Sequence, residues 1–163
     1  MTTIKRKRDG TRARTTRPKA QALGKSVAAS GAAPRMSLTE TFKALEKVLT
    51  LYSPPLKLWV SGSKSKPMTR LTVPSPVSIP GAYGGKPVDL EVASLIIQKG
   101  FVGFYFMPLY LKPALKSKIS LALRKRLKGK TCFHLTHADE TTREDVRRAV
   151  DLGTQLYRDR GWL

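Results

Sequence analysis

The stretch that decides the fold is DLEVASLIIQKGFVGFYFM, residues 89–107. Two apolar runs flank Lys99-Gly100, a pair suited to a tight turn, so the pattern predicts an antiparallel hairpin of residues 89–98 and 101–107. Both faces of the second run are apolar: Phe101, Tyr105 and Met107 on one, Val102, Phe104 and Phe106 on the other. A strand with one face in water shows polar alternation instead. We therefore expect this strand to lie centrally in a sheet, with helices on one side and the other face either buried or lining a groove.

Shorter strand patterns lie on both sides of this hairpin. Apolar residues alternate with other residues over 56–60 and again over 70–73, which predicts two strands joined by the loop SGSKSKPM. The segment PSPVSIPGAYGGKP is rich in proline and glycine and predicts a long loop. Residues 131–135 predict one further short strand.

Helix signals precede and follow these strands. Ser37 and Glu40 have the spacing of a capping box, and apolar residues at helical spacing follow until Pro54-Pro55. A short helix is predicted from Pro113, a second over residues 121–127 with Ser120 as its cap, and a last one from a capping box of Thr141 and Glu144. The whole pattern predicts one α+β domain over residues 37–163, an antiparallel sheet with helices packed on one face.

Charge divides the 163-residue chain into two parts. The formal charge is +20, from 31 Lys and Arg against 11 Asp and Glu. Residues 1–36 hold ten of the basic residues and one acid, with almost no large apolar side chains, so we expect a disordered basic tail. A field of this sign attracts polyanions such as nucleic acid. The tail residues predicted to contact them are Lys5, Arg6, Lys7, Arg8, Arg12, Arg14 and Arg17.

Cysteine content and hydropathy predict a cytoplasmic protein. Cys132 is the single cysteine, which excludes an internal disulfide framework. The basic N-terminal residues are not followed by the apolar segment of a secretory signal. Residues 92–111 approach the length of a membrane span, but Gln98-Lys99-Gly100 and Pro108 interrupt them, and a hairpin explains them better.

Residues 99–135, KGFVGFYFMPLYLKPALKSKISLALRKRLKGKTCFHL, carry a resemblance to a known family. The elements are Met107-Pro108-Leu109-Tyr110, Pro113-Ala114-Leu115, a basic helix and Gly129-Lys130-Thr131-Cys132-Phe133. In these the chain resembles the YdhG-like family, domain of unknown function 1801. The resemblance implies an α+β fold with a frataxin-like outline, and some relatives carry the label iron chaperone. It supplies a fold more than an activity.

The Gly129-Lys130-Thr131 motif does not fit a phosphate loop. That motif needs a second glycine five residues earlier, where this chain has Arg124. It also needs a strand before the loop and a helix after it, whereas here the predicted order is reversed. We therefore predict that Gly129 ends a helix and that Lys130 begins a strand.

A metal site is the next alternative. Cys132 and His134 would share one face of a strand, with His137 and Asp139 just beyond, and thiolate with imidazole suits zinc. A zinc site normally gathers three or four protein ligands, and the sequence shows no second Cys/His cluster. The acidic residues that iron would need are interleaved with Lys and Arg. A buried cysteine with two surface histidines is the simpler interpretation.

Neither catalysis nor a cofactor is predicted. No nucleophile and base stand at a recognisable spacing, and a cysteine in the middle of a strand is usually inert. Trp59, Tyr105, Met107 and Tyr110 are candidates for a ligand cleft, although aromatic residues at strand spacing more often form a core.

A cationic segment gives the strongest functional signal. Residues 112–130 contain no acid and eight basic residues: Lys112, Lys116, Lys118, Arg124, Lys125, Arg126, Lys128 and Lys130. On the predicted 121–127 helix, Arg124, Lys125 and Lys128 would share one face. Together with the tail, this predicts a non-enzymatic protein that binds nucleic acid or another polyanion without base specificity. A solvated helix face, a metal carrier and a small-molecule binding domain remain as alternatives.

Overall fold

The predicted hairpin lies in the middle of a six-stranded antiparallel sheet. The computed structural model describes residues 36–163, where β3 (Glu91–Gln98) pairs with β4 (Phe101–Phe106) across the Lys99-Gly100 turn. Gly100 adopts a φ of 88°, which L side chains rarely take. The strand order is β1-β2-β3-β4-β6-β5. The outer strands are β1 (Lys57–Ser63), β2 (Lys66–Thr72), β6 (Cys132–Leu135) and β5 (Leu127–Lys128).

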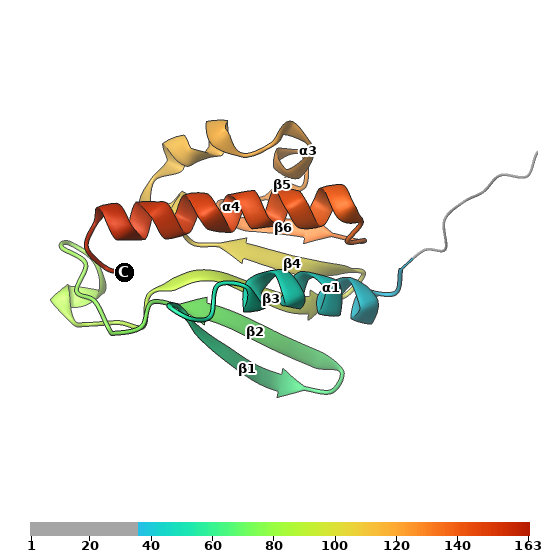
Figure 1. The fold of residues 1–163 in the computed structure, drawn as a ribbon, viewed down its shortest axis with the longest axis horizontal. Helices are drawn as coiled ribbons and strands as arrows, with labels where there is room; N and C mark the ends of the chain where they lie inside the picture. Colours follow the sequence, from blue (N-terminus) through green and yellow to red (C-terminus); the bar gives the residue numbers. More distant parts are fainter. Residues whose placement is uncertain (1–35) are drawn as a thin grey trace, which may run out of the picture. The chain divides into compact units, whose positions relative to one another are not determined.

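Two helices cover one face of this sheet (Figure 1). Both α1 (Leu38–Thr50) and α4 (Glu140–Asp159) pack against β3 and β4, and they also pack against each other. Their apolar faces meet the inward side chains of the central strands, and Leu95, Phe104 and Phe106 are fully buried there. The α+β fold with helices packed on one face of an antiparallel sheet is confirmed.

Short helical turns connect β4 to β5. They are α2 (Pro108–Leu111), η2 (Pro113–Lys118) and α3 (Leu121–Arg124), and they lie beyond the β5 edge of the sheet in Figure 1. A further 3-10 turn, η1 (Tyr83–Gly85), interrupts the long loop between β2 and β3. This connection after β4 positions the candidate site.

The second face of the sheet carries no helix of residues 36–163. The register places Arg70 opposite Ser94, Ser94 opposite Tyr105, and Tyr105 opposite Cys132. These residues alternate along their strands with the buried side chains that meet α1 and α4, so they point to the other side. Tyr105 and Cys132 are half-buried. This face is therefore neither a second core nor wholly exposed.

Several local expectations were confirmed and others were wrong. Ser37 and Glu40 form the predicted capping box, and Ser120 caps α3 as predicted. The predicted Thr141 capping box is wrong, because the Asp139 carboxylate accepts the Thr142 amide at 2.8 Å and α4 begins at Glu140.

The predicted loop 61–68 is wrong as well. Strands β1 and β2 extend through it and leave Lys64-Ser65 as the turn, because the two segments pair residue by residue up to Ser63 and Lys66. The seven-residue helix predicted over 121–127 ends after one turn at Arg124. The Arg126 carbonyl then accepts the His134 amide at 2.9 Å, and Leu127–Lys128 pair with β6.

The predictions for the basic tail fall on residues 1–35 and therefore lie outside the described residues. Within residues 36–163, no helix combines the length and the apolar character needed to cross a membrane.

Candidate anion-binding pocket

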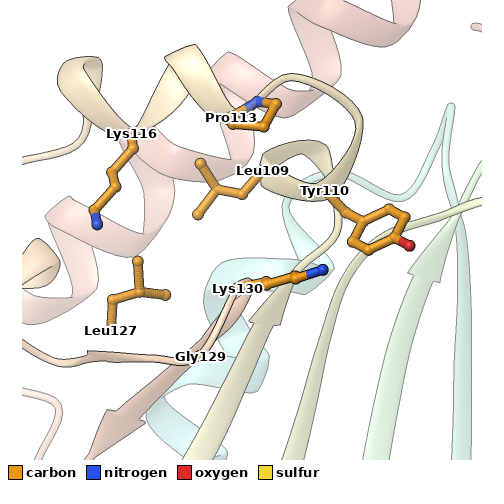
Figure 2. A pocket seen from close by; sticks show the side chains of 7 residues that line it. All are labelled: Leu109, Tyr110, Pro113, Lys116, Leu127, Gly129 and Lys130. Atoms are coloured by element: carbon orange, nitrogen blue, oxygen red, sulfur yellow. The ribbon is translucent and has the colours of Figure 1, made fainter.

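A pocket of about 540 Å³ opens where the connection after β4 passes the β5–β6 turn (Figure 2). This volume lies within the range of about 300–1,000 Å³ typical of small-molecule sites. The residues that line it are Leu109, Tyr110, Pro113, Lys116, Leu127, Gly129 and Lys130. They come from two segments separated in sequence and brought together by the β4–β6 pairing.

Proline and glycine shape the walls of the pocket. Pro108 and Pro113 each stand at the start of a helical turn, where the missing amide of proline leaves no hydrogen bond unmade. Gly129 adopts a φ of 71° in the turn between β5 and β6. The prediction that Gly129 ends a helix and Lys130 begins a strand is therefore wrong, because α3 ends at Arg124 and β6 begins at Cys132.

The pocket has an apolar floor and a cationic rim. In Figure 2 the side chains of Leu109 and Leu127 point toward one another, and Lys116 reaches in from η2. The Lys130 ammonium lies 5.5 Å from the centre of the Tyr110 ring, within cation–π range. Tyr110 remains 58% exposed. The arrangement suits a ligand with an anionic group beside a planar or apolar group.

The cationic segment 112–130 runs along this pocket. Six of its eight basic residues are exposed, while Arg124 and Arg126 are half-buried. None of the eight forms an ion pair with an acid of residues 36–163. Most ion pairs in that part of the chain lie instead on α4, around Glu140, Glu144 and Asp151. Apart from Arg126, which lies near Asp139, the segment therefore keeps its positive charge without an acidic partner in residues 36–163.

The predicted common face of Arg124, Lys125 and Lys128 does not form. Lys125 caps the single turn of α3, whereas Lys128 lies on β5 opposite Cys132. The spacing argument required the helix to continue through Lys128, and strand pairing ends it earlier. The three residues remain neighbours in sequence but belong to different elements.

The metal candidates do not converge in the described part of the chain. Cys132 and His134 share one face of β6 as predicted, but no group of three or more His, Cys, Asp and Glu gathers anywhere in residues 36–163. His137 contacts Arg126 at 3.0 Å and Asp139 at 3.5 Å. Burial raises the pKa of the Cys132 thiol, which opposes the thiolate form that metals and nucleophilic catalysis need.

The four candidates for an aromatic cleft are divided among different places. Tyr110 lines the pocket, whereas Trp59 and Tyr105 lie on the open face of the sheet. The predictions missed Leu109 and Pro113 as lining residues. The available signal was the resemblance itself, because its Met107–Tyr110, Pro113–Leu115 and Gly129–Phe133 elements meet around this pocket.

Comparison of the chain with protein families, with curated proteins and with solved structures finds no match. The site is therefore interpreted from its own chemistry.

Proposed function

We propose that this is a cytoplasmic, YdhG-like, non-enzymatic protein that binds nucleic acid through its cationic segment 112–130. The observation that carries the proposal is the concentration of eight basic side chains without an acid in this segment, none of which forms an ion pair with residues 36–163. Lysines that contact phosphates release counterions from nucleic acid, and this gives affinity without base recognition. The basic residues of the tail add to the same attraction.

The pocket adds a structural element to this charge. Lys116 and Lys130 line one pocket with Tyr110 and two leucines, so one phosphate and the sugar or base beside it find complementary groups together. A second hollow, between α1 and α4, also has lysines in its wall, but there they stand beside Glu40. The lining of the first pocket contains no acid, and this favours the binding of an anion there.

The test measures the affinity of the full chain for a random DNA duplex over a range of salt concentrations. The variant Lys116→Gln/Lys130→Gln removes two charges at the pocket, and Lys64→Gln/Lys86→Gln removes two exposed charges from loops away from it as a matched control. We expect the first pair to lower the slope of log K against log salt by about 2, at about 0.9 for each phosphate contact. The second pair should leave the slope nearly unchanged. Equal effects of the two pairs, or a slope near zero for the parent protein, would refute the proposal.

A second candidate function is the binding of a small anionic molecule in the pocket, and the volume of about 540 Å³ favours it. The same variants decide between the two. An aromatic sulfonate probe should bind at one equivalent, and Lys116→Gln/Lys130→Gln should abolish its binding. If the probe binds in this way and duplex DNA does not, the small-molecule function replaces the proposed one.

A further inference from the structure

The open face of the sheet presents aromatic rings that the pocket does not use. One row crosses all six strands in register: Trp59, Arg70, Ser94, Tyr105, Cys132 and Lys128. The next row contains Ile96, Gly103 and His134. No helix of residues 36–163 covers this face.

The Tyr105 ring occupies the space beside Gly103. A methyl group added at Gly103 would come within 2.9 Å of the Tyr105 ring, and the Cys132 sulfur lies 3.6 Å from the same point. A glycine in the middle of a strand weakens it, so a neighbouring group commonly occupies the space it leaves. Here that group is the aromatic ring of Tyr105, which remains half-buried and so keeps part of its surface accessible.

Trp59 is also held in place. Its indole N–H donates to the Thr72 hydroxyl at 3.0 Å, and Thr72 is 1% exposed. The indole itself is 49% exposed on an edge strand. An exposed tryptophan fixed by a hydrogen bond is a preorganised surface for a planar ligand, because little side-chain freedom is lost when the ligand binds.

A third platform lies near the hairpin end of β4. Phe101 and His134 stack with ring centres 3.6 Å apart and an angle of 12° between their planes. Beyond Tyr105, His134 lies in the next row of the open face and Phe101 in the row after it. Trp59 and Tyr105 are separated by three strand spacings, or about 14 Å.

The charges on this face favour an anionic partner. Register and alternation place Lys57, Lys66 and Lys128 on the same side as Trp59 and Tyr105. Glu91 pairs with Arg70 at 2.9 Å, and Asp89 lies with them at one end of the face. Lys128 belongs both to this face and to the cationic segment, and it joins the two surfaces.

We infer that the open face binds single-stranded nucleic acid, with bases stacked on Tyr105, Trp59 and the Phe101–His134 pair. The inference rests on the proposed function and adds a strand preference to it. Every base offers a flat face, so stacking on aromatic rings tolerates any sequence. In a duplex these faces are already stacked on neighbouring bases, and only phosphates remain accessible.

The test compares three ligands with the full chain: an oligothymidylate of about 12 nucleotides, an abasic oligomer of the same length and charge, and a duplex. We expect the oligothymidylate to bind more tightly than the abasic oligomer. Tyr105→Leu should weaken oligothymidylate binding about tenfold or more, whereas Tyr105→Phe, which keeps the ring, should change it little. Duplex binding should be unaffected by either change.

A second measurement leaves the open face intact. In a Trp162→Phe background, Trp59 is the single tryptophan, and stacked bases should quench its fluorescence while the abasic oligomer should not. The fluorescence of Trp59 keeps the inference testable if the Tyr105→Leu variant fails to fold. Equal affinity for both oligomers and no quenching by the oligothymidylate would overturn the inference.

The two proposals fail in different ways. If the open face does not bind single strands but the proposed function is right, duplex binding keeps its salt slope and its dependence on Lys116 and Lys130. If the proposed function is wrong but the open face does bind single strands, Lys116→Gln/Lys130→Gln leaves duplex affinity unchanged. Tyr105→Leu still weakens oligothymidylate binding in that case.

Discussion

Gly153 is the residue of α4 that faces Phe106 and Pro108. A methyl group at this position would stand 2.7 Å from the Phe106 ring and 2.7 Å from the ring of Pro108. Phe106 is fully buried, so it has little room to move. Gly153 therefore sets how near the last helix lies to the start of α2, and α2 forms one wall of the pocket.

Gly153→Ala should destabilise the protein although alanine is the better helix former. The gain in helix propensity is at most about 1 kcal/mol, and overpacking a dense core costs about 1–3 kcal/mol. We expect a net decrease in the free energy of unfolding, measured by urea denaturation. Phe106→Leu in the same chain should recover part of this decrease, giving a favourable coupling in a double-mutant cycle. A more stable Gly153→Ala protein would show that the contact relaxes freely.

At the residue scale, the sequence predicts what depends on local chemistry. The Ser37–Glu40 capping box was predictable because both partners lie within four residues. The cap of α4 was not, because Asp139 and Thr141 are both good caps and the choice depends on where the chain leaves β6. The contact between the Tyr105 ring and Gly103 was equally hidden, because it depends on how the side chains of β4 pack.

Helix α4 is the element whose stability should respond most clearly to pH. The Asp139 carboxylate caps its first turn, and hydrogen bonds from Thr142 hold the pKa of that carboxyl below its usual value, with His137 and Arg126 adding a smaller effect. Because the folded-state pKa is lowered, the stabilisation is present above the unfolded pKa of about 3.9 and disappears as the pH falls through the folded value.

Asp139→Ala should lower the free energy of unfolding at pH 7 by about 0.5–2 kcal/mol, the usual effect of removing a helix cap. Asp139→Asn keeps an acceptor but cannot titrate there. The stability difference between the parent and Asp139→Asn should therefore be smaller at pH 3 than at pH 7, with its main decrease below about pH 4. Thermal denaturation between pH 7 and pH 3 measures it. A difference that does not change with pH would contradict the lowered pKa.

Element prediction succeeded where burial and local pattern agree. The β3–β4 hairpin combines a Lys-Gly turn with two long apolar runs, and it forms at the predicted residues. Strand β5 is only two residues long and is held in place by its pairing with β6. The sequence favoured a helix there because Leu123 and Leu127 are four residues apart. The pocket depends on this pairing, so its lining could not be assembled from separate helix and strand patterns.

The distribution of charge distinguishes the surfaces of the whole domain. Acidic side chains on α4 pair with Arg143, Arg147 and Arg148, and the hydrogen bonds from Arg147 and Arg148 hold the pKa of Glu144 at about 2. The cationic segment 112–130 has no such partners in residues 36–163. One side of the domain is thus balanced by its own acids and another remains available to an external anion.

The domain should fold without residues 1–35 and bind nucleic acid more weakly. Within the described residues the buried core extends from Phe42 to Tyr157, and α1 carries its own cap at Ser37. A chain that begins at Met36 should therefore unfold cooperatively with nearly the same free energy as the parent. The removed residues hold ten Lys and Arg and one acid, so the slope of log K against log salt should fall by about 0.9 for each phosphate that they neutralise in the full chain. Calorimetry measures the stability, and duplex titration over salt measures the slope.

In the truncated chain, Lys116→Gln/Lys130→Gln should still lower the slope, because the pocket is intact. If the truncated domain does not fold, the boundary at residue 36 is wrong. If it folds but Lys116→Gln/Lys130→Gln no longer changes the slope, the binding belongs to residues 1–35 alone.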